Sequence, residues 1–317
     1  MKFVHDDKEF GALLRIVADK HGLGLGLVEK DYWVTHALWA LQHQGFELWF
    51  KGGTSLSKGF GLLQRFSEDL DIKIEPGSVK GLAPVANWTG EGKPAVTLRK
   101  AYFEGLLEKI QVPGVAAAIG ADLDDSWRAV GIQLRYPGKH LSELKGLTPF
   151  VLLEVGDARV TPSVACDVTS FVHEKLEATG QAEEFLDNRP KGLRCLHPLV
   201  TLLEKLDAIT RRFPKTSVPA AKFVRHYEDA ARIVLAKSLP KLDGFKDAKA
   251  LMQSLLDNKQ ITGAASARTS ALDAGDDARW KELELAWSAI EPMFWGPRSS
   301  LKECCVALRS WVAKELE

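Results

Sequence analysis

The pattern of apolar and polar positions predicts a short run of alternating helices and strands early in the chain. Apolar side chains recur every three to four residues from 28 to 44, and Gly45 closes this run. The spacing predicts one amphipathic helix. The aromatic segment 46–51 predicts a strand that runs into a pair of glycines. A second helix is then expected to begin at Thr54 or Ser55, since both are good N-cap residues.

Three further segments have the character of strands. Residues 70–74 alternate with period two before a Pro-Gly pair, and residues 129–136 and 150–155 are also rich in β-forming side chains. A helix is expected at about 97–111, after a stretch rich in Gly, Pro, Ala and Asn.

From His197 onward the pattern is helical. We expect helices at 199–212, 220–237, about 244–257, 277–290 and 300–316. Strands followed by helices indicate an α+β domain over residues 1–190 and an all-helical domain over 191–317, with the boundary at 188–192.

The composition is that of an ordinary globular protein. The 317 residues include 42 Lys and Arg against 42 Asp and Glu, and 45% are hydrophobic. No run of 18 apolar residues could span a bilayer, and the first residues are too polar for a signal peptide. The protein is therefore expected in the cytoplasm with no membrane partner. Its four cysteines form no CxxC motif and are expected to be reduced thiols.

The charges are unevenly distributed along the chain. Residues 188–241 contain 12 Lys or Arg and 4 Asp or Glu, whereas residues 120–187 contain 6 basic and 12 acidic residues. The two segments could simply attract each other. Alternatively, the basic segment binds phosphates or a nucleic-acid backbone.

The segment from Lys51 to Lys58, KGGTSLSK, is the first candidate for chemistry. A strand that leads through Gly52 and Gly53 into a helix presents free backbone N–H groups and the positive end of a helix dipole. This arrangement predicts a phosphate site, although the spacing is not that of a Walker loop. The residues expected to contribute to it are Gly52, Gly53, Thr54, Ser55 and Lys58.

Two aspartates follow at strand spacing. Asp69 and Asp71 are separated by one residue, so both carboxylates project from the same face while Leu70 and Ile72 point into the core. Their repulsion would be relieved by a cation, and oxygen ligands favour Mg²⁺ or Mn²⁺ over zinc. The alternative is a solvated edge strand.

Glu154 is the best candidate for a third metal ligand. It is the one charged residue inside an apolar strand, where an unpaired carboxylate would be costly. The alternatives are a salt bridge to a basic neighbour, or the same role for Asp157 or Asp167.

The order and spacing of these motifs resemble a known family. Residues 51–58, then 65–71, then a lone strand carboxylate resemble the minimal polymerase-β-type nucleotidyltransferase pattern. Together with EKDYW at 29–33, they resemble the AbiEii/AbiGii toxin family. Residues 197–208 resemble its third motif, which places a lysine on a helix, and residues 225–229 its fourth, which ends in an aspartate.

The resemblance implies a polymerase-β-like domain with a small mixed sheet, followed by a helical domain. It implies transfer of a nucleoside monophosphate from an NTP to a hydroxyl, with release of pyrophosphate. Mg²⁺ or Mn²⁺ would be held by Asp69, Asp71 and Glu154, Lys205 would bind the triphosphate, and Asp229 would orient Lys205 or the acceptor. The family often has serine where this chain has Thr54, so either hydroxyl, that of Thr54 or that of Ser55, could contact phosphate.

In related toxins the acceptor is an RNA end, typically a tRNA, and a cognate antitoxin is encoded beside the toxin. Three alternatives stay open: a protein hydroxyl as acceptor, a small-molecule nucleotidyltransferase, and an inactive nucleotide-binding regulatory module. A small cationic acceptor would need an acidic pocket, against which the basic second half argues. The intact acidic residues argue against a decayed site.

Overall fold

A computed structural model describes the chain except for residues 66–68, 122–123 and 145–146. Residues 66–68, which belong to the second motif, therefore lie outside the described part. The chain divides into two compact units. Unit 1 comprises residues 1–59, 67–160 and 165–195, and unit 2 comprises residues 60–66, 161–164 and 196–317.

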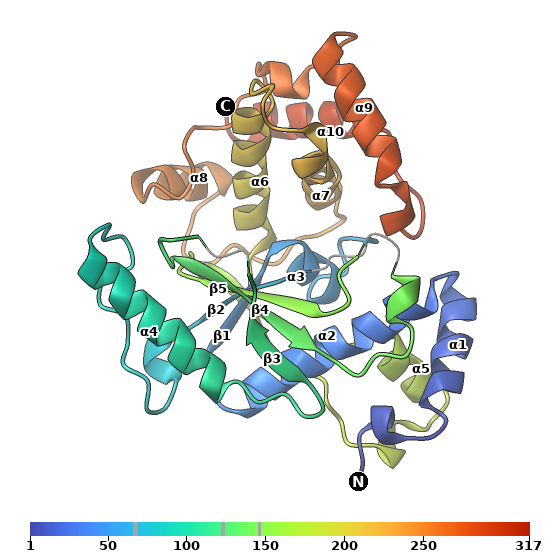
Figure 1. The fold of residues 1–317 in the computed structure, drawn as a ribbon. Coiled ribbons are helices and arrows are strands. Elements are labelled where there is room, and N and C mark those ends of the chain that lie inside the picture. Colours follow the sequence, from blue (N-terminus) through green and yellow to red (C-terminus); the bar gives the residue numbers. More distant parts are fainter. Residues whose placement is uncertain (66–68, 122–123, 145–146) are drawn as a thin grey trace. The chain divides into compact units, whose positions relative to one another are not determined.

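A seven-stranded mixed sheet forms the centre of unit 1 (Figure 1), in the order β3-β4-β5-β2-β1-β7-β6. The four predicted strands are all present. The sequence pattern missed three others, β3, β6 and β7, which have four residues each and lack the aromatic residues that marked β1. The strands are β1 (Leu48–Lys51), β2 (Asp69–Ile74), β3 (Ala116–Ile119), β4 (Ala129–Arg135), β5 (Val151–Gly156), β6 (Ser163–Cys166) and β7 (Leu193–Leu196).

The two faces of the sheet differ in polarity. Phe50, Leu70, Ile72, Ile132 and Leu153 are fully buried on one face and form the core. The residues that alternate with them lie on the opposite face, as the pleat of a strand requires. This second face carries the polar side chains, and we call it the open face.

In the described residues of unit 1 there are five α-helices. These are α1 (Phe10–His21), α2 (Leu25–His43), α3 (Gly52–Lys58), α4 (Lys93–Lys109) and α5 (Phe171–Ala178). The amphipathic prediction for α2 is wrong, because most of its residues are buried on every side. The helix packs against α1, α5 and β5, and a helix enclosed in this way has no solvent face to carry a polar stripe. The sequence pattern did not predict α1 or α5.

Unit 2 is built from helices, as expected. They are α6 (Pro198–Arg212), α7 (Arg225–Val234), α8 (Ala248–Asp257), α9 (Ala278–Ala289) and α10 (Leu301–Glu315). The single helix expected over 220–237 is instead a 3₁₀ turn at Ala220–Lys222 followed by α7. Helix α7 packs against α6 and α10. In the described part of the chain, no helix has both the length and the apolar character needed to cross a bilayer.

Candidate active site

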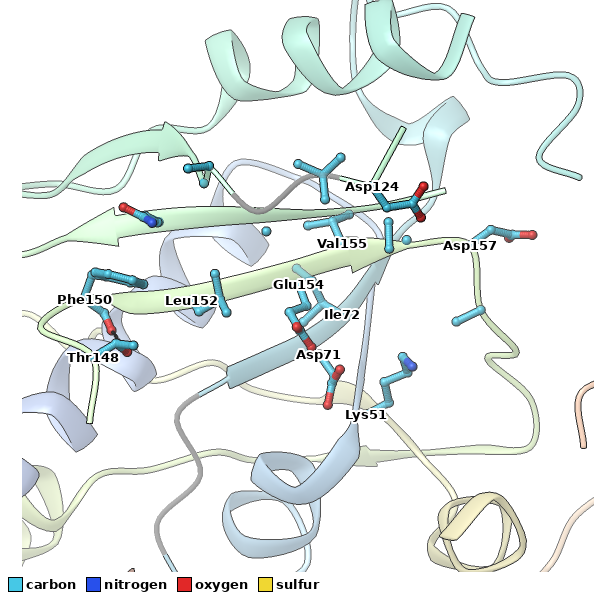
Figure 2. A pocket seen from close by; sticks show the side chains of 18 residues that line it. Lys51, Asp71, Ile72, Asp124, Thr148, Phe150, Leu152, Glu154, Val155 and Asp157 are labelled. Carbon is cyan, nitrogen blue, oxygen red and sulfur yellow. Dashed lines mark hydrogen bonds between the residues drawn. The ribbon is translucent and has the colours of Figure 1, made fainter. Parts of the chain in front are cut away.

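Four strands align a row of candidate site residues across the open face. Lys51 on β1 pairs with Asp71 on β2, Asp71 pairs with Glu154 on β5, and Glu154 pairs with Gly131 on β4. Figure 2 shows the carboxylates of Asp71 and Glu154 side by side, with Lys51 on the neighbouring strand. Asp69 lies two residues before Asp71 on the same face of β2. The register thus brings together the two aspartates and the glutamate that the sequence analysis selected.

A glycine is required where β1 meets α3. Gly52 has a φ of +74°, and a Cβ added there would lie 1.9 Å from Asp71 Oδ2. Any other side chain would therefore displace the Asp71 carboxylate or strain the backbone. Helix α3 begins at this glycine, two residues before the expected Thr54. The close approach sets the first turn of α3 directly against Asp71.

The two hydroxyls of the glycine motif have different environments. Thr54 is buried, and its hydroxyl donates to the backbone carbonyl of Asp69 at 2.6 Å. Ser55 is also buried, and its hydroxyl has no hydrogen-bond partner in the part of the chain that the structure describes. Thr54 therefore ties α3 to the start of β2 and helps to fix the position of Asp69.

Lys58 lies at the other end of α3 and contacts α2. Its ammonium is 2.5 Å from Asp31 Oδ1 and donates to Thr35 Oγ1 at 3.1 Å and to the Thr169 carbonyl at 2.9 Å. These three contacts anchor the C-terminal end of α3 to the interior of unit 1. The structure does not bring the Lys58 ammonium together with the row of carboxylates.

The EKD segment of α2 supports the surroundings of the site. Glu29 accepts hydrogen bonds from the backbone N–H groups of Lys139 and His140. Lys30 donates to the carbonyl and the hydroxyl of Thr148 at 2.9 and 3.1 Å, while Asp31 holds Lys58. All three charged residues of the segment are buried. They fix α3 and the loops that flank β4 and β5.

The pairing of Asp71 with Glu154 shifts the pKa of the Glu154 carboxyl group. Burial, together with the charge of Asp71 and a hydrogen bond to it, raises the pKa of Glu154 to about 7. Asp69 contributes to the same shift, while Lys51 opposes it. Perturbed carboxyl groups of this kind are typical of functional sites. Two adjacent carboxylates of which one tends to hold a proton are a natural site for a divalent cation.

The donor chemistry fits Mg²⁺ or Mn²⁺. The row supplies carboxylate oxygens without sulfur or imidazole, which are the ligands that these hard cations prefer. Among the described residues, no group of three or more His, Cys, Asp or Glu side chains has a ready metal-binding geometry. The fit therefore rests on the adjacent pair Asp71 and Glu154, with Asp69 on the same face.

A hollow of about 580 Å³ opens beside Glu154. Strands β4 and β5 and the segments next to them form most of its wall. Thr148, Phe150 and Leu152 lie toward one end of β5, and Asp157 lies beyond the other end (Figure 2). Lys51 and Asp71 also line it, so the carboxylate row forms one border of the hollow.

Unit 2 contains a second charged cluster. Asp229 on α7 is fully buried and accepts hydrogen bonds from Lys205 Nζ at 2.7 Å and from Arg65 at 2.6 and 2.8 Å. Burial by itself would raise the pKa of Asp229, but the two cations outweigh it and hold the pKa well below its usual value. Lys205 is itself mostly buried. Asp229 thus fixes the position of both cations.

The comparison with protein families decides the assignment. The model of the family described as "Nucleotidyl transferase AbiEii toxin, Type IV TA system" matches residues 37–299. This chain belongs to the AbiEii family. It is accordingly a nucleotidyltransferase, and the family is one of toxin–antitoxin systems, which implies an NTP substrate and an antitoxin partner.

The solved structure of MenT4 agrees with the fold of this AbiEii protein. MenT4, a nucleotidyltransferase toxin from Mycobacterium tuberculosis, matches with a TM-score of 0.53 at 17% identity, over 94% of this chain and 87% of MenT4. JHP933 from Helicobacter pylori matches over 90% of this chain and 92% of its own, at 14% identity and a TM-score of 0.32. No curated protein sequence matches.

Two residues of this AbiEii protein were missed as individual candidates. Lys51 is in the row with Asp71 and Glu154, and its place follows from strand register alone. Arg65 is buried against Asp229, 164 positions later in the chain. Both residues lie within the motifs at 51–58 and 65–71. Their contacts become visible only in the folded structure, through the strand register for Lys51 and the ion pair with Asp229 for Arg65.

Proposed function

We propose that this protein uses Mg²⁺ or Mn²⁺ to transfer a nucleoside monophosphate from an NTP to a hydroxyl of RNA, with a tRNA as the first acceptor to test. The observation that carries the proposal is the pairing of Asp71 with Glu154 directly beside the glycine turn at Gly52. Membership of the AbiEii family supports the reaction class.

The glycine turn would bind the phosphates of the NTP. The first N–H groups of α3, at Gly52, Gly53 and Thr54, have no acceptor within the helix, as at any helix start. Such donors favour an anion. Thr54 would act mainly through its backbone, since its hydroxyl is already bonded to Asp69. Lys58 would act by anchoring α3 through Asp31 rather than by contacting phosphate.

The acidic residues would hold the cation. Asp69 and Asp71 would hold the cation that binds the triphosphate, and Glu154 would help to hold the cation near the acceptor hydroxyl. A bound divalent cation supplies charge neutralisation at the phosphates and lowers the pKa of the attacking hydroxyl. The oxygen of that hydroxyl forms a bond to the α-phosphorus, the bond from this phosphorus to the bridging oxygen breaks, and pyrophosphate leaves. The hydroxyl proton passes to solvent.

Lys205 would contribute charge to the triphosphate, as the resemblance to the family implies. Lys205 is a compact cation that does not compete with the carboxylates for metal. Asp229 would orient it through the 2.7 Å contact, with Arg65 completing the ion pair. The excess of basic residues in 188–241 supports RNA as the acceptor, because a nucleic-acid backbone is bound through cationic side chains.

The test is incubation of the protein with total RNA, Mg²⁺ and each α-³²P-labelled NTP in turn. Label on RNA, lost in Asp71→Ala, is the expected result. Label found only on protein or on small molecules would show that RNA is not the acceptor. The absence of label with every NTP would contradict the proposed transfer reaction. Expression without an antitoxin should also slow bacterial growth, whereas Asp71→Ala at matched protein levels should not.

A further inference from the structure

The open face arranges the parts of the site in a fixed order. The glycine turn lies at the end of β1, Asp71 on β2, Glu154 on β5, and Gly131 and Gln133 on β4. Neighbouring strands are about 4.8 Å apart. The sheet therefore separates the glycine turn from β4 by three strand spacings, with the two carboxylates between them. Whatever binds over β4 approaches the carboxylates from the side opposite the glycine turn.

Glycines clear the space on the β4 side. Gly131 is the register partner of Glu154, and Gly120 and Gly156 also line the hollow. A Cβ added at Gly131 would lie 3.1 Å from Leu152 Cδ1, so a larger residue would crowd the Leu152 side chain that lines the hollow. The glycine therefore leaves the Leu152 surface beside Glu154 uncovered.

The charges around the hollow do not suit a triphosphate. Asp71, Asp124, Glu154 and Asp157 line it, against Lys51 as the single cation among the described lining residues. Two of these carboxylates are already engaged, since Asp157 pairs with Lys73 at 3.2 Å and Asp124 accepts hydrogen bonds from Ser126. The hollow is therefore repulsive to the triphosphate of an NTP, and among its described lining residues Asp71 and Glu154 remain to hold the metal cation.

The end of the hollow near Phe150 suits a neutral planar group. Phe150 and Leu152 supply an apolar wall, and Gln133 lies on the strand beside them, in register with Leu152. Arg135 donates to Gln133 Oε1 at 2.8 Å, which leaves the amide N–H₂ as a donor toward the hollow. Lys30 fixes Thr148 at the same end. An apolar surface with one oriented donor is typical of a nucleobase site.

We infer that the hollow binds the terminal nucleoside of the acceptor, with its base against Leu152 and Phe150 and Gln133 donating a hydrogen bond to an acceptor atom of that base. This inference rests on the proposed function and extends it. It makes Gln133 a specificity residue for the acceptor strand rather than for the NTP.

The test compares acceptor use with NTP binding in purified full-length variants. Gly131→Ala and Gly131→Val fill the hollow in two steps, and Gln133→Met removes the donor at nearly constant volume. Ala101→Val is the matched control, since Ala101 is an exposed position of α4 outside the hollow lining. Melting curves establish that each variant is folded, and the conservative variants Gly131→Ala and Gln133→Met keep the test valid if Gly131→Val does not fold.

The expected result is a change confined to the acceptor. Gln133→Met should raise the KM for RNA about tenfold, which corresponds to the free energy of one lost hydrogen bond. The two Gly131 variants should lower kcat/KM for RNA, and valine should lower it more than alanine. The dissociation constant of a fluorescent NTP with Mg²⁺ should stay within about twofold of wild type. Weaker NTP binding with unchanged KM for RNA would overturn the inference and assign the hollow to the NTP base. The wild-type protein tests the proposed function, and the variants test the inference. If the wild-type protein labels no RNA, both proposals fail.

Discussion

The Lys205 ammonium donates to the Asp229 carboxylate at 2.7 Å, and both groups are buried in unit 2. Asp229 also binds Arg65, so its charge remains compensated if Lys205 is removed. This relationship allows the proposed contribution of Lys205 to catalysis to be separated from its contribution to stability.

Lys205→Met should lower kcat/KM for the NTP by about 10²-fold or more, the scale of one lost preorganised electrostatic contact. The loss of stability should be about 1–3 kcal/mol, because Arg65 keeps Asp229 paired. Steady-state kinetics against NTP concentration and a denaturant melt measure the two effects. Lys249→Met, at an exposed lysine of α8, is the control. An unchanged kcat/KM would return Lys205 to a purely structural role.

Asp229→Asn should mainly affect stability. The substitution leaves Arg65 and Lys205 close together without the shared carboxylate, and breaking a buried ion pair in this way costs about 3–5 kcal/mol. A chemical denaturation series at pH 7 measures the change. The double variant Asp229→Asn with Lys205→Met should recover part of the loss, because it removes one of the two uncompensated charges. Additive losses in the double variant would contradict the coupling.

Asp71→Ala should abolish transfer, with at least a 10²-fold fall in kcat, while the fold remains intact. Removing one carboxylate relieves its repulsion with Glu154, so the melting temperature in EDTA should equal or exceed that of wild type. Asp69→Ala should behave in the same way toward activity. Near-normal turnover in either variant would contradict the assignment of metal ligands.

Metal affinity should depend on the protonation of Glu154. Its pKa is raised to about 7 in the metal-free protein, so a bound cation has to displace a proton at lower pH. The affinity for Mn²⁺ should therefore rise from pH 6 to about pH 7.5 and then level off. Isothermal titration at several pH values measures this dependence. In Glu154→Gln the affinity should be lower and the pH dependence in this range should be lost; a retained dependence would mean that another group titrates.

The central strands and the glycine motif could be predicted because their signals are local. Alternation at 70–74 and the glycine pair after an aromatic strand are set by residues adjacent in sequence. The same alternation gave the shared face of Asp69 and Asp71, and the single charge in an apolar strand indicated Glu154. Their alignment with Lys51 could not be predicted, because register between β1, β2 and β5 depends on residues up to about a hundred positions apart.

The contacts of the buried charged residues could not be predicted from the sequence pattern either. Lys58 follows the glycine motif by one turn, which suggested a phosphate contact, whereas its ammonium is bonded to Asp31 on α2. Lys30 looks like a surface lysine of a helix, yet it is fully buried and bonded to Thr148. Propensity and periodicity describe a single element, and these contacts arise only when elements pack together.

A buried hydrogen-bond network in unit 1 should make stability depend on pH. The amide oxygen of Asn188 accepts a hydrogen bond from His173 Nε2, and its amide nitrogen donates to His36 Nδ1 and to the Tyr32 hydroxyl. Burial lowers the pKa of both His36 and His173 to about 4. In the unfolded chain each histidine titrates near 6.5. Between pH 6.5 and 4 the unfolded chain therefore binds more protons than the folded protein, and stability falls as the pH is lowered.

The size of this effect can be measured if the opposing contribution of Glu154 is removed. The raised pKa of Glu154 makes the folded protein bind a proton between about pH 4.5 and 7, which acts in the opposite direction. Denaturation should therefore be followed from pH 7 to 5 in Glu154→Gln, where each buried histidine should cost of the order of 2 kcal/mol over this interval. His173→Gln should make the slope shallower but not abolish it, because His36 stays buried and the pKa values of His5, His197 and His226 are also lowered. Replacing the exposed His43 by Asn is the control. A flat stability profile in the Glu154→Gln background would mean that His36 and His173 are solvated, and the network around Asn188 would then not hold them in the neutral form.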